Sequence, residues 1–227
     1  MTFTIVARCR RTGQFGIAVA SSSPAVAARC AHVRAGVGVV ATQNVTDPRL
    51  GPAALDLMQA GATPQAALDA LATRSHTEHR QLIALNAEGL ATRSGLQTLG
   101  FYGAAEGQDC AAAGNLLARP GIPAAMTAAF ETALAATSNG ELGARLLAAL
   151  AAGLAAGGEA GPVHSAGLLV AGTESWALTD LRVDWDDTDP IGRLQATWEV
   201  WAPQMHDYVR RALDPDVAPG FAVPGTA

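Results

Sequence analysis

The chain has 227 residues, of which 49% are hydrophobic and 15% charged, and its net charge is −5. This length and composition predict one globular domain with a sizeable core, and the acidic balance argues against a nucleic-acid partner. All fifteen basic residues are arginine. Without lysine the chain cannot form a Schiff base with pyridoxal phosphate or hold a nucleotide phosphate with a Walker lysine. We expect no cofactor.

Two apolar, β-favouring runs open the chain, at residues 3–9 and 15–21. The short polar connection between them, with Gly13 at its bend, predicts an antiparallel hairpin. The second run is apolar on both faces, so the sheet that it joins should be covered on both sides.

Strand and helix patterns alternate along the rest of the chain. Thr63 and Pro64 are typical of a helix start, as capping residue and first helical position. The patterns predict further strands over residues 36–42, 79–85, 90–93, 110–117, 165–171 and 176–183, and helices over residues 52–60, 64–73, 124–136, 140–156 and 190–213.

Hairpin-built sheets interrupted by helix pairs favour an α+β fold. We expect a four-layer α-β-β-α sandwich, in which two antiparallel sheets are stacked and the helices lie outside. Residues 1–213 should form this single domain, and residues 214–227 a Pro- and Gly-rich C-terminal tail.

The cysteines and the hydropathy pattern bear on the compartment. Cys9, Cys30 and Cys110 are too widely spaced for a disulfide framework or a metal-binding knuckle. No basic segment precedes an apolar run at the start, and the most apolar region, residues 142–156, is shorter than the roughly 20 residues of a bilayer span. We expect reduced core thiols, a cytoplasmic protein and no membrane partner.

Thr2 stands directly behind Met1, at the head of the first predicted strand. If Met1 is removed, Thr2 combines a nucleophilic hydroxyl with a free α-amine, whose usual pKa of about 8 suits it to act as the base. A β-branched residue at a strand start is equally well explained by packing. The local pattern leaves both interpretations open.

Hydroxyl groups should gather beside Thr2. A hairpin bend centred on residues 12–13 places Thr2 opposite Ser23 and Thr4 opposite Ser21, within two residues of register. Ser21 and Ser23 can then orient the amine or the hydroxyl of Thr2, although polarity at a strand end accounts for them as well.

Amide side chains at strand ends and turns are candidate donors to an oxyanion, because they donate hydrogen bonds without titrating. Turn formation and backbone capping are the alternative roles of asparagine. His164, at the start of a strand, can shuttle protons near neutral pH or serve structure alone. The predicted site comprises catalytic Thr2, Ser21, Gln43 and Asn115, and binding residues Ser23, Asn44 and His164.

Short motifs in a fixed order resemble those of a known bacterial family. They are Thr2 to Ala7, Thr12-Gly13, Gly16 to Ser21, Gly36 to Gln43, Gly51-Pro52, Gly114 to Leu117 and Asp180 to Asp184. Together they resemble the family catalogued as domain of unknown function 1028, whose fold is similar to that of N-terminal nucleophile (Ntn) hydrolases. The resemblance spans residues 1 to about 212. It implies the four-layer sandwich and hydrolysis of an amide.

The sharpest charge cluster comprises Asp184, Asp186, Asp187 and Asp189. Clustered carboxylates suit Ca²⁺ or Mg²⁺, so metal-assisted hydrolysis with a histidine is an alternative. Acidic residues ahead of Pro190 also suit the positive end of the helix predicted there, and we favour this capping role. We therefore assign no metal ligand.

The leading prediction is an Ntn amidohydrolase that cleaves an amide bond of a small or peptide-like substrate through Thr2. Trp198, Trp201 and Tyr208 share a helical face that indicates packing or a subunit interface, and we expect a homo-oligomer. Retained Met1 would turn the amine of Thr2 into an amide and remove the base. The alternative is then a non-catalytic Ntn-like fold that serves as a small-molecule-binding or oligomeric scaffold.

Overall fold

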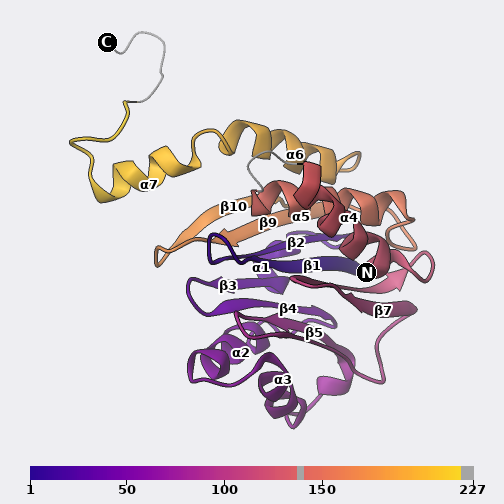
Figure 1. Ribbon diagram of the computed structural model, residues 1–227. Helices are drawn as coiled ribbons and strands as arrows, with labels where there is room; N and C mark the ends of the chain where they lie inside the picture. Colours follow the sequence, from indigo (N-terminus) through magenta and orange to yellow (C-terminus); the bar gives the residue numbers. More distant parts are fainter. Residues whose placement is uncertain (137–140, 221–227) are drawn as a thin grey trace.

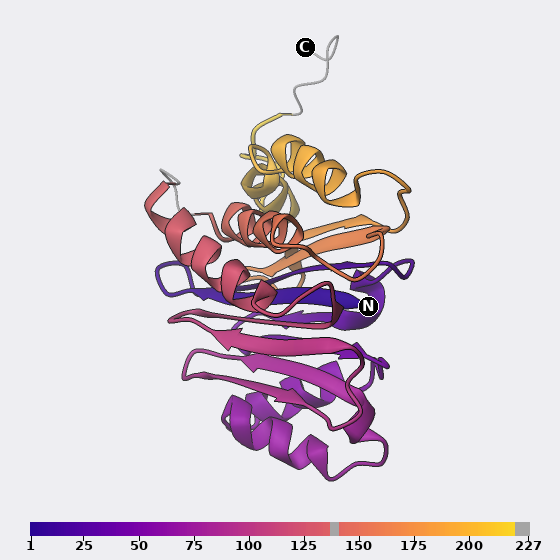
Figure 2. The same ribbon diagram turned by 90° about the vertical axis from the view of Figure 1, so that its right-hand side faces the viewer.

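The computed structural model describes residues 1–136 and 141–220 and stacks four layers of secondary structure (Figure 1). Two antiparallel sheets lie face to face in the middle, and helices cover the outer face of each (Figure 2). This arrangement confirms the α+β sandwich expected from the sequence.

The larger sheet, sheet A, has the first hairpin at its centre. In spatial order its strands are β10 (Ala177–Val183), β9 (Ser165–Ala171), β2 (Gln14–Ser21), β1 (Thr2–Cys9), β8 (Cys110–Leu117) and β7 (Phe101–Glu106). Sheet B consists of β3 (Ala31–Arg34), β4 (Gly38–Asn44), β5 (Arg80–Leu85) and β6 (Leu90–Ser94).

The helices divide between the two outer faces (Figure 2). Sheet A is covered by α4 (Ile122–Ala136), α5 (Leu142–Ala155) and α6 (Pro190–Trp201), and sheet B by α2 (Leu50–Gln59) and α3 (Pro64–Ala72). A short α1 (Ala27–Cys30), a 3₁₀ turn η1 (Thr77–His79) and α7 (Met205–Leu213) complete the described elements. None of the helices within the described ranges is long and apolar enough to cross a bilayer.

Side chains of β1 alternate between two cores. Phe3 and Ile5 are fully buried beneath α4 and α5, whereas Val6 packs between the sheets. Because successive side chains of a strand point to opposite faces, Thr2 and Thr4 share the inward face with Val6. The first hydroxyls of the chain therefore lie between the sheets.

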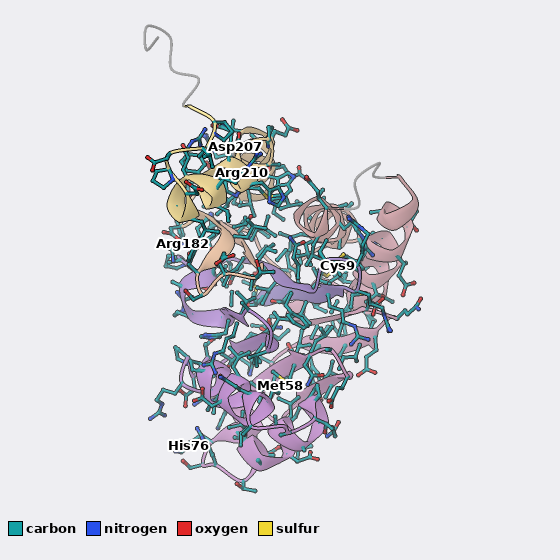
Figure 3. All side chains as sticks on the ribbon, turned by 60° about the vertical axis from the view of Figure 1, so that its left-hand side comes forward. Cys9, Met58, His76, Arg182, Asp207 and Arg210 are labelled. Atoms are coloured by element: carbon teal, nitrogen blue, oxygen red, sulfur yellow. The ribbon has the colours of Figure 1, made fainter. Side chains whose placement is uncertain are left out.

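A separate core joins sheet B to its helices. Met58 of α2 packs with Leu68 and Leu71 of α3 against Leu82 of β5. Figure 3 shows Met58 in this layer, on the opposite side of the sandwich from the helices that cover Cys9.

The three cysteines are buried and free, as expected, and burial raises the pKa of Cys110 to about 12.

Both helix starts that the sequence pointed to are capped. Thr63 accepts a hydrogen bond from the Ala66 N–H at 3.2 Å, and Asp189 accepts one from the Gly192 N–H at 2.8 Å. Of the acidic cluster, Asp189 has the capping role that we favoured. Residues 137–140, between the two helices predicted over residues 124–136 and 140–156, and residues 221–227 of the predicted tail lie outside the described residues.

Some predicted elements need correction. The single helix expected over residues 190–213 is wrong: α6 ends at Trp201 and α7 begins at Met205. Pro203 lies between them and lacks the N–H that a continuous helix needs at that position.

Strands β3 and β7 were not among the predicted elements. The edge strand β7 exposes Phe101 and Tyr102, so it lacks the alternation of apolar and polar residues that marks a half-buried strand.

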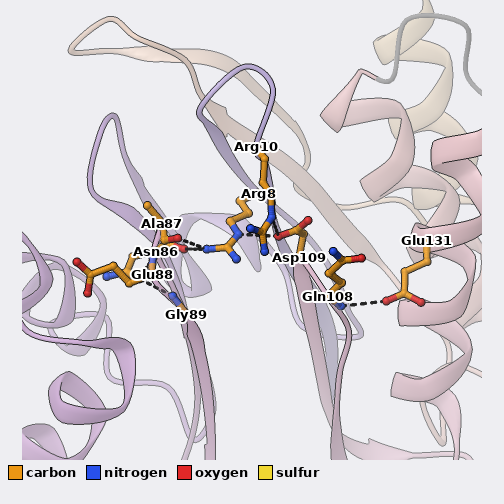
Figure 4. Close-up of polar contacts among 9 residues, drawn as sticks. All are labelled: Arg8, Arg10, Asn86, Ala87, Glu88, Gly89, Gln108, Asp109 and Glu131. Carbon is orange, nitrogen blue, oxygen red and sulfur yellow. Dashed lines mark hydrogen bonds and ion pairs between the residues drawn. The ribbon is translucent and has the colours of Figure 1, made fainter.

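Arg8 ties the two sheets together at the end of the sandwich opposite Thr2 (Figure 4). From β1 it donates hydrogen bonds to the Asn86 and Ala87 carbonyls, in the β5–β6 turn of sheet B, and to the Asp109 carboxylate at 2.7 Å. Arg10 also donates to Asp109 but is 61% exposed, against 11% for Arg8. Burial acts to raise the pKa of Asp109, but these two arginines outweigh it and lower that pKa.

We expect Arg8→Met to lower the free energy of unfolding by about 2 kcal/mol, because it leaves two carbonyls without their donor and Asp109 with the exposed Arg10 as its remaining arginine. Arg10→Met removes an exposed contact to the same carboxylate and should cost less than about 0.5 kcal/mol. Urea unfolding of both variants measures the difference. Equal losses would show that Arg8 does not join the sheets.

Candidate functional site

Buried polar side chains fill the inter-sheet space around the start of β1. Thr2 is 5% exposed, and the β1–β8 register places Asn115 directly opposite it. On the other side β1 pairs with β2, where the Thr2 hydroxyl lies 3.4 Å from the Ser21 hydroxyl. The central position of β1 thus brings polar groups from both neighbouring strands to Thr2.

The β1–β2 hairpin is shifted by two residues from the predicted pairing, which placed Thr4 opposite Ser21. Thr4 pairs with Val19, so Thr2 lies beside Ser21. The expected cluster of hydroxyls still forms, because the Ser23 hydroxyl is 2.9 Å from that of Ser21.

The hydroxyls of Thr2 and Ser21 converge on one carbonyl. Each donates to the carbonyl oxygen of Met1 at 2.5 Å. This carbonyl belongs to the peptide bond that joins Met1 to Thr2. Two hydroxyl groups, of Thr2 and Ser21, therefore face the same carbonyl group.

Gln43 and Asn115 are linked through Gln81. The side-chain amide nitrogens of Gln43 and Asn115 donate to Gln81 Oε1 at 2.7 and 3.2 Å. The side-chain oxygen of Gln43 accepts from the Thr4 hydroxyl at 2.5 Å. The amide donors of Gln43 and Asn115 are thus already engaged. Among the described residues Asn115 Oδ1 finds no hydrogen-bond partner, which leaves one free acceptor in the cluster.

Asn44 lies at the end of β4 and braces two loops. Its φ of +74° is a left-handed backbone conformation that asparagine tolerates better than most residues. The side chain donates to the His79 carbonyl at 2.7 Å and accepts from the Leu99 N–H at 3.3 Å. The structure therefore gives Asn44 a structural role and does not bring it to Thr2 by these contacts.

His164 lies beside Ser21 through its backbone. Its N–H donates to the Ser21 carbonyl at 2.9 Å, and its ring stacks on Trp185 with the centroids 4.3 Å apart. The ring nitrogen Nδ1 is 3.5 Å from an Asp187 carboxylate oxygen. Both ring contacts fix the orientation of the imidazole at the rim of the site.

Glu159 is a site residue that sequence reasoning missed. It is 4% exposed, and both of its carboxylate oxygens accept from the Ser22 N–H at 3.0 Å. Burial raises the pKa of Glu159 to about 7, while the Met1 amino group, Ser22 and His164 act to lower it. A carboxyl group that titrates near neutrality therefore lies beside the start of the chain.

The sequence offered only weak signals for the missed residues. Glu159 is the lone carboxylate within residues 157–161, which are otherwise glycine and alanine, and nothing local shows that this turn approaches Ser22. Gln81 interrupts an apolar strand at a position that shares its face with Ile83 and Leu85. A polar residue on a buried face is a usable signal of a polar cluster.

The acidic cluster forms no metal site in the described ranges, where no group of three or more His, Cys, Asp or Glu side chains converges as metal ligands would. Asp186 accepts from the N–H and hydroxyl of Thr188 and from the Asp189 N–H, which closes a turn ahead of α6. His76 lies at the surface of the loop after α3 (Figure 3).

Comparison with known proteins identifies the family. The model of the family of unknown function DUF1028 matches residues 2–194. The chain belongs to this family. The chain is similar to the DUF1028 protein SPO2555 from Silicibacter pomeroyi, whose crystal structure superposes on it with a TM-score of 0.82. The two sequences are 28% identical, and the match covers 92% of this chain and 94% of SPO2555. No curated protein matches the chain.

The raised pKa of Glu159 predicts a pH dependence of stability. Between pH 4.5 and about 7 the unfolded chain has released the Glu159 proton while the folded chain still holds it, so stability falls as the pH rises. Glu159→Gln keeps an oxygen acceptor for Ser22 but does not titrate. The free energy of unfolding of this variant should therefore decrease by about 3 kcal/mol less between pH 5 and pH 8 than that of the original protein. Urea unfolding at pH 5 and pH 8 measures it. The exposed Glu88→Gln is the matched control, and an unchanged pH dependence in Glu159→Gln would contradict the assignment.

Proposed function

We propose that this protein is an amidohydrolase in which Thr2, after removal of Met1, is the N-terminal nucleophile. One observation carries the proposal: the Thr2 and Ser21 hydroxyls both donate to a single carbonyl oxygen in a buried site. The resemblance of the motifs to a family with an Ntn-like fold supports it. The free, buried cysteines also support the cytoplasm as the compartment.

The reaction needs only Thr2 and water. The freed α-amine accepts the hydroxyl proton as Oγ1 forms a bond to the substrate carbonyl carbon. The tetrahedral intermediate collapses, the amide C–N bond breaks, and the amine gives the proton to the leaving nitrogen. Water then attacks the ester, the acid product departs, and the Thr2 hydroxyl is restored.

Ser21 is the best-placed donor for the developing oxyanion, because its hydroxyl already points at a carbonyl oxygen beside Thr2. Gln43 and Gln81 then act by holding Asn115 in place. The unpartnered Asn115 Oδ1 is available to accept a hydrogen bond from the amine of Thr2, its partner in the β1–β8 register. In this proposal the Ser21 hydroxyl stabilises the oxyanion, in place of the side-chain amides of Gln43 and Asn115 that the sequence suggested.

We expect Thr2→Ala to lower kcat on a library of small amides by at least about 10³-fold, since it removes the nucleophile but keeps a small second residue. Thr2→Ser should retain measurable turnover. Intact-mass measurement of each preparation establishes that Met1 is absent. Initial rates of amide cleavage give the comparison.

Thr4→Ser is the matched control, because Thr4 lies on the same face of β1 and is fully buried but donates to Gln43. It should leave kcat within about threefold, because it keeps the hydroxyl and removes only a methyl group. Full activity in Thr2→Ala, or activity in protein that retains Met1, would remove the nucleophile assignment and favour a binding or scaffold role.

A further inference from the structure

We propose that the site takes substrates with a free α-ammonium group, namely amides of α-amino acids, with Glu159 receiving the ammonium and Gly161 leaving room for the side chain. This inference rests on the proposed function and names its substrate class. It comes from the way in which Met1 is seated.

Met1 is itself an aminoacyl group bound in front of Thr2. Its carbonyl oxygen accepts from the hydroxyls of Thr2 and Ser21. Glu159 lies on the same side of the site, because it accepts from the N–H of Ser22, next to Ser21, and stands two residues before Gly161, which adjoins the Met1 side chain. Amine, side chain and carbonyl therefore each meet a different part of the site. A free aminoacyl amide presents the same three groups in the same order.

The carboxylate is held rigidly enough to select an ammonium. Glu159 forms a β-bridge with Leu117, and both of its oxygens are fixed by the Ser22 N–H. The charged or titratable neighbours that act on it are the Met1 amino group and His164. Loss of Met1 removes its amino group and leaves a buried carboxyl group for which a substrate ammonium is the natural partner.

Gly161 sets the size of the space for the side chain. A Cβ added at Gly161 would lie 3.0 Å from the Met1 Cε, which is tighter than an ordinary van der Waals contact. Glycine at this position therefore allows a side chain as long as methionine. Alanine should restrict the site to smaller ones.

Kinetics with L-methionine p-nitroanilide and its N-acetyl derivative test the ammonium contact. Near pH 7.5 we expect protein without Met1 to prefer the free amine at least about tenfold in kcat/KM. Glu159→Gln should lower kcat/KM for the free amine about 10- to 100-fold and for the N-acetyl derivative less than about threefold. Equal losses on both substrates would overturn the inference, because Glu159 would then serve Thr2 or the fold.

Gly161→Ala gives an independent test of the side-chain space. It should lower kcat/KM for L-methionine p-nitroanilide at least about tenfold relative to glycine p-nitroanilide, since the added methyl group meets only the longer side chain. An unchanged ratio would overturn the placement of the side chain.

Calorimetric titration of L-methionine amide into Thr2→Ala protein without Met1 keeps the test independent of turnover, because this variant lacks the nucleophile. It should bind the amide at least about tenfold more tightly than the double variant Thr2→Ala, Glu159→Gln does. Absence of binding would overturn the inference even if Thr2-dependent cleavage of other amides were found. Conversely, binding that depends on Glu159 without any Thr2-dependent cleavage would remove the proposed hydrolysis and leave the ammonium site standing.

Discussion

Strand β1 is hydrogen-bonded to β2 on one side and to β8 on the other, and it is buried under helices on one face and under sheet B on the other. Because β1 is constrained on all four sides, a shift of its register by one residue would turn its apolar side chains from the core that each now occupies to the opposite face of the sheet. The position of Thr2 follows from this constraint. So does its proximity to Ser21 and Asn115, because they sit on the two strands that pair with β1.

The inter-sheet space changes character along its length. Near Arg8 it is closed by charged groups, in the middle it is apolar, and around Thr2 it is filled by hydroxyls and amides. Buried amides are costly unless they are paired, and Gln43 and Gln81 are paired with each other and with neighbouring backbone carbonyls. In this cluster of buried amides Asn115 has one unpartnered oxygen, and a buried polar atom without a partner calls for an explanation such as a catalytic role or a bound water or ion.

The layers and most strand positions could be predicted from local pattern, because alternation, turn residues and caps act within a few residues. The hydroxyl cluster was predictable for the same reason, since a short hairpin fixes which residues of two strands meet. Glu159 was not, because its approach to Ser22 depends on how the segment after α5 crosses the end of sheet A. The break at Pro203 was visible in the sequence but was outweighed by the helical pattern around it. The exposed edge strand β7 carries too little burial to leave a periodic signal.

The position of Met1 beside Glu159 and Gly161 affects how the protein is best produced in the laboratory. A purification tag fused ahead of Thr2 would thread through the space where Met1 now lies and would stay attached to the nitrogen that the proposed chemistry needs free. Helix α7 packs near β10, which is separated from β1 by two strands of sheet A. A tag placed after α7 leaves the first peptide bond to the cell's own processing enzymes.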